Sequence, residues 1–249
     1  MSTGLSPELG DVTAIIKTIM RPACLNRLVE SIRRYYPRLK ILIADDSTDA
    51  SASHKFGPDV TVIPLPYDTG LGAARNVLVD AVQTGFLLYL DDDYVFTEKT
   101  KIEVFRQILD ANNDIDIVGG AMLDFRNGAQ SRRLYHGLMR RQGDDLVYTN
   151  GCYQKRMGSH PVEIVDVILN FFLARTESVK KVMFDGDLKI NTHTDFFLRA
   201  MGKLKVAFTP AVEIIHQPER SAKYTELRER KYVDLMKKKH GFKRQVYAW

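Results

Sequence analysis

Residues Phe86–Phe96 read Phe-Leu-Leu-Tyr-Leu-Asp-Asp-Asp-Tyr-Val-Phe, an apolar run that ends in three consecutive carboxylates before apolar residues resume. Five apolar or aromatic residues without alternation are typical of a strand that is buried on both faces. Three adjacent carboxylates repel one another unless a cation holds them, and Mg²⁺ or Mn²⁺ prefers such oxygen ligands and often shares them with substrate phosphates. The strand tip therefore predicts a metal site and a phosphorylated substrate, with a solvated acidic turn or a helix cap as the alternative for the acids alone.

Outward from this run, the first half of the chain alternates between strand-like and helix-like segments. This alternation predicts an α/β fold with a mostly parallel sheet and right-handed crossovers. The strand that ends at Ala44 is also followed by acids, Asp45 and Asp46, so we expect both acidic groups at one crevice beyond the carboxyl ends of the strands. The expected strands are Val12–Ile16, Lys40–Ala44, Val60–Pro64, Phe86–Leu90 and Ile115–Gly120, and the expected helices are Leu25–Tyr36, Ala73–Gln83 and Lys99–Leu109.

The second half of the chain is less regular. Residues Asp124–Pro161 are rich in Arg, Gly, Tyr and Gln, which predicts an antiparallel excursion or a mobile loop. Further on, the patterns predict helices over Glu177–Phe184, Asn191–Met201 and Ser221–Lys239, and strands over Lys205–Phe208 and Val212–Ile215.

The composition is that of an ordinary globular protein, with 249 residues, 45% hydrophobic and 27% charged. No apolar stretch is long enough to span a bilayer, and the polar residues Met1–Gly10 lack the apolar core of a signal peptide. Two cysteines make neither a disulfide framework nor a zinc site. We therefore expect a cytoplasmic protein.

The net charge of +5 is unevenly distributed, with basic residues concentrated in Arg132–Arg156 and in the tail beyond Pro218. Such patches suit an anionic nucleotide, an anionic membrane surface or nucleic acid, although a solvated helix face is the alternative for the tail. No nucleic-acid-binding motif is visible, so we expect no nucleic-acid partner. Peripheral contact of the basic tail with the inner membrane surface is the expectation that remains.

Several segments together resemble a known enzyme family. The resemblance is to GT-A fold glycosyltransferases of family 2, and more narrowly to the β-1,4-N-acetylgalactosaminyltransferases that build gangliosides, and it covers Val12–His216. It implies a Rossmann-like, mostly parallel sheet flanked by helices, with a smaller antiparallel acceptor-side portion. The segments that carry it are Asp11–Thr18 (DVTAIIKT), Ile43–Ser47 (IADDS), Gly70–Asn76 (GLGAARN), Leu90–Phe96 (LDDDYVF), Val118–Ala121 (VGGA), Leu169–Thr176 (LNFFLART) and His193–Leu198 (HTDFFL).

The patterns and the resemblance together predict a division of the chain. Residues 1–10 would be an N-terminal tail and residues 11–218 the glycosyltransferase domain. Within that domain, residues 11–120 would form the nucleotide-binding half and residues 121–218 the acceptor-binding half. Residues 219–249 would form a basic C-terminal helix.

The acidic run would then be the Asp-x-Asp motif of this family. The resemblance implies that Asp93, Asp91 and a late histidine, His216, hold Mn²⁺ or Mg²⁺, while Asp91 or Asp92 touches the ribose or a bridging water. The metal would bridge the two phosphates of a nucleotide sugar and act as a Lewis acid on the leaving diphosphate. A structural histidine is the alternative for His216.

The remaining donor-binding residues are also assigned by resemblance. Asp45 or Asp46 would accept a hydrogen bond from the uracil N3–H, with a simple turn as the alternative. Gly70 permits close backbone approach and Arg75 suits bidentate phosphate contact, although turn chemistry alone explains the glycine. The rim of the base and diphosphate site would be formed by Lys17, Thr18 and Arg21.

Asp195 is the expected catalytic base. An inverting transfer needs a group that takes the proton of the acceptor hydroxyl as its oxygen attacks the anomeric carbon. Asp195 lies at the start of an apolar helix, which is where the resemblance implies that the carboxylate base of inverting enzymes falls. The alternative is an aspartate that only caps the helix. His193 is expected either to assist substrate binding or to be a surface residue.

These features predict a metal-dependent inverting glycosyltransferase that uses a UDP-sugar. UDP-GalNAc is the first choice of donor, followed by UDP-GlcNAc, UDP-Gal and UDP-Glc, and the acceptor would be a glycan or a lipid-linked glycan. A sugar-nucleotide nucleotidyltransferase is one alternative, but Lys17–Pro22 lacks the glycine-rich loop of such enzymes. A non-catalytic binding protein is another. The ganglioside-building enzymes carry an anchor and luminal cysteines, and this sequence shows neither feature. We therefore expect a bacterial-type soluble relative whose acceptor is not a ganglioside.

Overall fold

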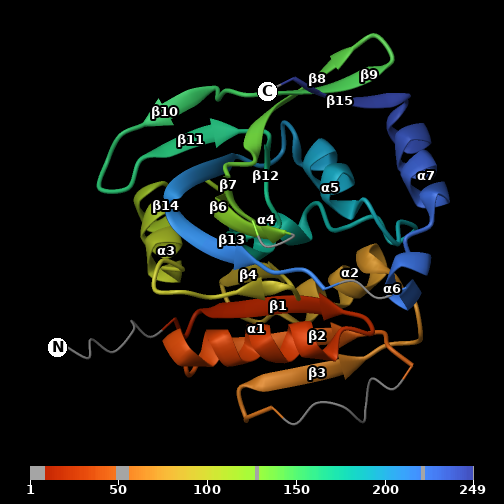
Figure 1. Ribbon diagram of the computed structural model, residues 1–249. Helices are drawn as coiled ribbons and strands as arrows, with labels where there is room; N and C mark the ends of the chain where they lie inside the picture. Colours follow the sequence, from red (N-terminus) through yellow and green to blue (C-terminus); the bar gives the residue numbers. More distant parts are fainter. Residues whose placement is uncertain (1–8, 49–55, 127–128, 220–221, 249) are drawn as a thin grey trace.

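The computed structural model describes residues 9–48, 56–126, 129–219 and 222–248, which form two sheets with helices around them (Figure 1). Among these residues the larger sheet has the order β10-β11-β14-β6-β13-β4-β1-β2-β3, with β5 paired to β14 and β7 paired to β6. Its strands are β1 (Val12–Thr18), β2 (Lys40–Asp45), β3 (Val60–Pro64), β4 (Phe86–Asp91), β5 (Tyr94–Val95), β6 (Ile117–Arg126), β7 (Ala129–Arg133), β10 (Gln154–Arg156), β11 (Val162–Val165), β13 (Phe172–Arg175) and β14 (Val206–His216).

The smaller sheet has the order β12-β8-β9-β15. Figure 1 shows it at the top of the molecule, with α7 and α6 descending along one side toward the ends of β1 and β2. Its strands are β8 (His136–Gln142), β9 (Asp145–Thr149), β12 (Val167–Ile168) and β15 (Arg244–Ala248). The helices of the described chain are α1 (Pro22–Tyr35), α2 (Leu71–Ala81), α3 (Ile102–Ala111), α4 (Thr176–Lys180), α5 (Thr192–Ala200), α6 (Ala222–Glu226) and α7 (Arg230–His240).

The expected α/β fold is confirmed. Strands β3, β2, β1 and β4 are parallel neighbours, and β1 lies between the two strands that end in acids. Thr18 is in register with Asp45, and Lys17 is in register with Asp91. The charged ends of three buried strands therefore lie at one edge of the sheet.

The second half of the chain brings β14 to the same edge. β13 runs antiparallel between β4 and β6, and β14 runs parallel to β6. The two strands expected over 205–215 are one strand with a register shift between Phe208 and Glu213. His216, at its end, pairs with Tyr94 of β5, which follows Asp93 directly.

Apolar helix faces cover both sides of the large sheet. On one side α1 contributes Leu25, Leu28 and Ile32 to a core that also contains Phe105 of α3. Pro22 at the start of α1 fixes a helical φ without the loss of a hydrogen bond. On the other side α2, α5 and the small sheet share a second core, exemplified by Leu78, Phe197 and Tyr148.

The prediction of a single basic helix over residues 219–249 is wrong. It consists of α6, α7 and the strand β15, which pairs in parallel with β9. Gly241 ends α7 with a φ of 66°, a left-handed conformation that favours glycine at a helix C-terminus. The excursion expected over Asp124–Pro161 is antiparallel, as the β6–β7 and β8–β9 pairs show.

None of the described helices is long and apolar enough to cross a bilayer.

A buried ion-pair cluster joins α5 to α7. Asp195 Oδ2 accepts hydrogen bonds from Arg199 Nε at 2.9 Å and Nη2 at 2.7 Å, and Asp195 Oδ1 lies 2.8 Å from His240 Nε2. Burial raises the pKa of the Asp195 carboxyl, but His240 and Arg199 outweigh burial and lower it below its usual value. The cluster therefore ties the C-terminal region to the domain.

The start of α2 is packed against residues 185–189. The amides of Leu71 and Gly72 donate to the carbonyls of Lys189 and Leu188 at 3.2 and 3.0 Å, which satisfies two of the free N–H groups at this helix end. A Cβ on Gly72 would lie 1.9 Å from the carbonyl oxygen of Asp185. Glycine is therefore required for this close approach.

Gly72→Ala is expected to lower the free energy of unfolding by about 2 kcal/mol, because the methyl group collides with backbone. The sign is opposite to the usual gain from Gly→Ala in a helix. Urea unfolding measures it, with Gly57→Ala as the matched control, since a Cβ there meets no heavy atom within 4 Å. A Gly72→Ala protein as stable as wild type would contradict this packing.

Asp195→Asn is expected to lower the free energy of unfolding by about 2 kcal/mol at neutral pH, because Arg199 loses a charged partner. The folded pKa of Asp195 is depressed, so its contribution is present above the unfolded value of about 3.9 and is lost as the pH falls through the folded pKa. The difference from wild type, followed by urea unfolding, should therefore shrink below about pH 4. A difference that grows in acid would contradict the ion pair, and the exposed Asp144→Asn serves as control.

Candidate active site

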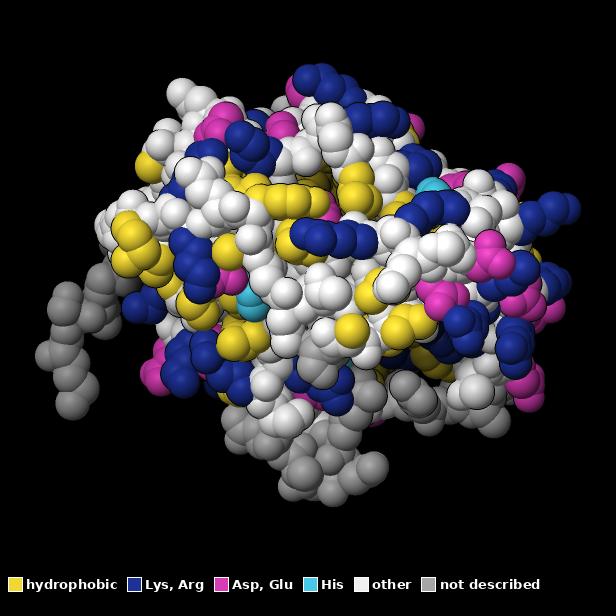
Figure 2. All heavy atoms as spheres, turned by 90° about the horizontal axis from the view of Figure 1, so that it is seen from above, with side chains coloured by type: hydrophobic (Ala, Val, Ile, Leu, Met, Phe, Trp, Pro, Cys, Tyr) yellow, Lys and Arg dark blue, Asp and Glu magenta, His cyan; other side chains and the backbone are white. Residues whose placement is uncertain are grey.

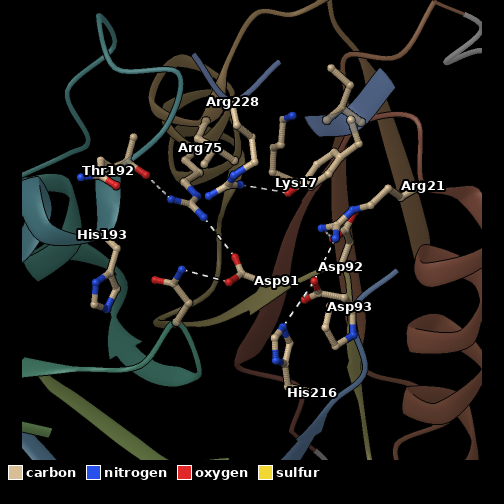
Figure 3. A pocket seen from close by; sticks show the side chains of 16 residues that line it. Lys17, Arg21, Arg75, Asp91, Asp92, Asp93, Thr192, His193, His216 and Arg228 are labelled. Atoms are coloured by element: carbon tan, nitrogen blue, oxygen red, sulfur yellow. Dashed lines mark hydrogen bonds and ion pairs between the residues drawn. The ribbon is translucent and has the colours of Figure 1, made fainter. Parts of the chain in front are cut away.

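A pocket of about 270 Å³ lies at the edge where β1, β4 and β14 end (Figure 3). It draws residues from both halves of the domain and from the C-terminal region. It is lined by Lys17, Ile19, Arg21, Leu71, Arg75, Asp91, Asp92, Asp93, Asn170, Asn191, Thr192, His193, His216, Pro218, Tyr224 and Arg228. The three acids are thus brought together with most of the cations expected beside them.

Arg21 lies against the second and third acids. Its Nε donates to Asp92 Oδ2 at 3.2 Å, its Nη2 pairs with Asp92 Oδ1, and its Nη1 donates to Asp93 Oδ2 at 2.9 Å. Thr18 Oγ1 donates to Asp92 Oδ2 at 2.7 Å. Burial raises the pKa of Asp92, whereas hydrogen bonding from His216 and the charge of Arg21 outweigh burial and lower the pKa of Asp93. Of these two acids, Asp93 is the one held more firmly as a carboxylate.

His216 is oriented between two acids. Its Nδ1 lies 2.9 Å from Asp124 Oδ1, which leaves Nε2 facing Asp93 Oδ2 at 3.5 Å. Burial lowers the pKa of His216, but the carboxylates of Asp93 and Asp124 outweigh burial and raise it. Asp124 is the type of carboxylate that commonly fixes a metal-binding histidine from behind.

Asp93 and His216 fit a divalent cation. Carboxylate and imidazole ligands suit Mn²⁺, and such ions usually take further ligands from substrate phosphates and water. Asp91 does not join this pair, and within the described residues no group of three His, Cys, Asp or Glu side chains could hold a metal ion. The expectation that Asp91 is a metal ligand stays a prediction.

Asp91 is bonded to Arg75 and not to His216 (Figure 3). Its Oδ1 accepts from Arg75 Nη2 at 3.1 Å and its Oδ2 accepts from Asn170 Nδ2 at 2.9 Å. Arg75 also donates to Thr192 Oγ1, and its guanidinium lies 4.8 Å from the centre of the Tyr89 ring. Arg75 is thereby fixed in the pocket wall, where a phosphate can meet it.

The acids at the end of β2, Asp45 and Asp46, lie outside the pocket lining. Asp46 Oδ1 pairs with Lys17 Nζ at 2.7 Å, and its Oδ2 accepts the Gly70 amide at 3.0 Å. Asp45 Oδ1 accepts the amide of Ser47 at 2.9 Å and its hydroxyl at 2.5 Å, as in a turn. Burial lowers the pKa of Lys17 despite its partner Asp46. A uracil contact by Asp45 or Asp46 stays a prediction.

Asp195 also lies outside the pocket lining, in the cluster with Arg199 and His240. Its carboxylate contacts Arg199 and His240 instead of the residues that line the pocket. The expected place of Asp195, at the start of an apolar helix, is confirmed by the first turn of α5, and its role as catalytic base stays a prediction.

Several pocket residues were not predicted as site residues, and for His193 only a part in substrate binding was considered. Asn170 follows the short strand β12, within a segment already used for the family resemblance. His193 precedes Asp195 in the same motif. Tyr224 and Arg228 come from the C-terminal region, where Tyr224 stacks against the Arg21 guanidinium at 4.3 Å and its hydroxyl accepts from Arg228 Nη1 at 3.1 Å. Tyr224 lies on α6, whereas Arg228 comes after the end of that helix.

The chain is similar to curated enzymes. It is 36% identical over 207 residues to beta-1,4 N-acetylgalactosaminyltransferase 2 of Mus musculus, covering 83% of this chain and 39% of that protein. It is 35% identical over 211 residues to beta-1,4 N-acetylgalactosaminyltransferase 1 of Homo sapiens, covering 82% of this chain and 38% of that protein. The chain therefore spans about two fifths of the length of these relatives.

Solved structures share the fold. The crystal structure of GalNAc-T7 with UDP, GalNAc and Mn²⁺ superposes with a TM-score of 0.62 at 16% identity, covering 84% of this chain and 43% of that chain. The sequence model of the family described as "Glycosyl transferase family 2" matches residues 13–183, which is more than half of the chain. The resemblance seen in the motifs is confirmed, and the chain belongs to glycosyl transferase family 2.

Proposed function

We propose that the protein transfers a sugar from a UDP-sugar to an acceptor hydroxyl with inversion at the anomeric carbon, in the presence of Mn²⁺ or Mg²⁺. The observation that carries the proposal is the pairing of Asp93 with His216 in a pocket that also holds Arg21 and Arg75. A carboxylate–imidazole pair beside two guanidiniums suits a diphosphate that arrives with a divalent cation.

Asp93 and His216 would hold the cation, and when bound it supplies Lewis-acid stabilisation of the charge on the departing diphosphate. Asp124 keeps the His216 ring oriented for this role. Arg75, fixed by Asp91 and Thr192, offers a preorganised donor for phosphate oxygens. Arg21 now neutralises Asp92 and Asp93, and a cation at Asp93 would free part of its guanidinium for the diphosphate.

The comparisons support the donor class. The curated relatives are named as N-acetylgalactosaminyltransferases, and the GalNAc-T7 structure contains UDP, GalNAc and Mn²⁺. UDP-GalNAc is therefore the first donor of the proposal, ahead of UDP-GlcNAc, UDP-Gal and UDP-Glc. The acceptor is proposed by class alone, as a glycan or a lipid-linked glycan.

The proposal includes a cytoplasmic location with peripheral membrane contact through the C-terminal region. Its support is the basic last turn of α7, Lys237–His240. Two features reduce the unpaired positive charge that this region presents to a membrane. Lys239 pairs with Asp185 and Asp187, and Figure 2 shows Lys and Arg side chains interspersed with acidic ones on the face that it views.

The donor screen is the test of the reaction. With Mn²⁺, wild type is expected to hydrolyse UDP-GalNAc slowly and to gain thermal stability from it, and chelation with EDTA should abolish hydrolysis. Asp93→Asn should reduce hydrolysis by at least about 100-fold, because it weakens the cation site. Asp144→Asn, on an exposed loop, should match wild type. Equal activity in EDTA, or no response to any uridine donor, would contradict the proposal.

Membrane contact is tested by sedimentation with vesicles. Wild type is expected to bind vesicles that contain anionic phosphatidylserine and not vesicles of phosphatidylcholine, and binding should fall as salt rises. Replacing Lys237 and Lys238 by Gln should weaken this binding severalfold. Binding equal on both kinds of vesicle, or absent from both, would remove the membrane from the proposal.

A further inference from the structure

Arg21 occupies the place in the pocket where the proposed function, on which this inference rests, puts a divalent cation (Figure 3). Its Nη1 donates to Asp93 Oδ2 at 2.9 Å. The same carboxylate oxygen lies 3.5 Å from His216 Nε2, the other proposed ligand. The guanidinium of Arg21 is thus a positive charge that balances Asp93 in this structure.

Arg21 has more contacts with Asp92 than with Asp93. Its Nε donates to Asp92 Oδ2 at 3.2 Å and its Nη2 pairs with Asp92 Oδ1, so both oxygens of that carboxylate are engaged. Thr18 Oγ1 also donates to Asp92 Oδ2, at 2.7 Å. A forked contact between a guanidinium and a carboxylate is stronger and more directional than a single hydrogen bond. Asp92 can therefore keep Arg21 in the pocket when the contact with Asp93 is lost.

A further contact of Arg21 is independent of both acids. The guanidinium carbon lies 4.3 Å from the centre of the Tyr224 ring, whose face attracts the cation. The hydroxyl of Tyr224 accepts from Arg228 Nη1 at 3.1 Å, and both of these residues line the pocket. Arg21 can therefore stay over the ring while one of its nitrogens changes partner.

The surroundings make a guanidinium and a divalent cation compete for Asp93. The side chains of Arg21, Asp92 and Asp93 are 11%, 1% and 9% exposed, so water screens their charges poorly. Two positive charges beside one carboxylate oxygen then repel each other strongly. Arg21 Nη1 must therefore leave Asp93 Oδ2 before that oxygen can ligate a cation. The diphosphate of the donor offers the freed N–H group a new acceptor.

We propose that Arg21 is an exchangeable counter-cation of Asp93, which makes the binding of nucleotide and divalent cation cooperative. Without nucleotide, Arg21 competes with the cation for Asp93. With nucleotide, Arg21 keeps its contact with Asp92 and turns Nη1 to a phosphate oxygen, which leaves Asp93 to the cation. Each ligand therefore favours the binding of the other, as linkage requires. The task of Asp92 is then to anchor Arg21 rather than to ligate the cation.

The test is calorimetry of Mn²⁺ and UDP binding to the full chain. Arg21→Gln removes the charge and keeps an amide that can donate to Asp92. Without UDP, this variant should bind Mn²⁺ at least about tenfold more tightly than wild type, because a like charge has left the site. The factor by which saturating Mn²⁺ tightens UDP binding should be severalfold smaller in the variant than in wild type. A purely structural role of Arg21 would leave the Mn²⁺ affinity unchanged or lower it.

Arg106→Gln is the matched control, because it removes the same charge outside the pocket lining, where Arg106 pairs with Asp11 and Asp110. It should bind Mn²⁺ as wild type does.

Arg21→Lys answers the question if Arg21→Gln does not fold. It keeps the charge, but a single ammonium lacks the fork that holds Asp92, so its Mn²⁺ affinity should lie between those of wild type and Arg21→Gln. A Mn²⁺ affinity of the folded Arg21 variants equal to or below that of wild type would overturn the proposal. A wild type that binds no Mn²⁺ even with UDP would overturn the proposed function as well.

Discussion

Most of the carboxylates that follow from the ends of β2 and β4 are paired with cations, and these pairs form much of the pocket wall. Lys17 neutralises Asp46, Arg21 neutralises Asp92 and Asp93, and Arg75 neutralises Asp91. Removing one partner from such a pair leaves an uncompensated charge in a poorly solvated place, which costs several kcal/mol. The pairs therefore hold the strand ends, the start of α1 and the start of α2 in one arrangement before any substrate arrives.

This arrangement also explains how an anionic diphosphate can enter a pocket lined with acids. The carboxylates keep the guanidiniums of Arg21 and Arg75 in place, so little reorganisation is needed when phosphate oxygens arrive. A divalent cation at Asp93 and His216 would add the positive charge that the acids have neutralised. The C-terminal region completes the wall, because Tyr224 covers the Arg21 guanidinium while α7 is anchored through His240 and Asp195.

Much of this could be predicted from local patterns. The continuous apolar run before Asp91 predicted a buried strand, and parallel pairing of such strands brings Lys17, Thr18 and Asp91 to one edge. The direction of a side chain on a helix is harder to predict. Asp195 and His193 are two residues apart, and which of them faces the pocket depends on how α5 packs through Phe196 and Phe197. The C-terminal contacts of Tyr224 depend on chain segments about two hundred residues apart, which no local pattern records.

The central claim is that one pocket, at the ends of β1, β4 and β14, takes the diphosphate of a uridine nucleotide with a cation on Asp93 and His216. A crystal structure with UDP and Mn²⁺ tests it most directly, because anomalous scattering locates the manganese independently of the nucleotide. The expected result is a manganese peak in contact with Asp93 and His216, with the diphosphate of UDP against Arg75. A diphosphate bound elsewhere, or a manganese ion bound away from Asp93, would contradict the account.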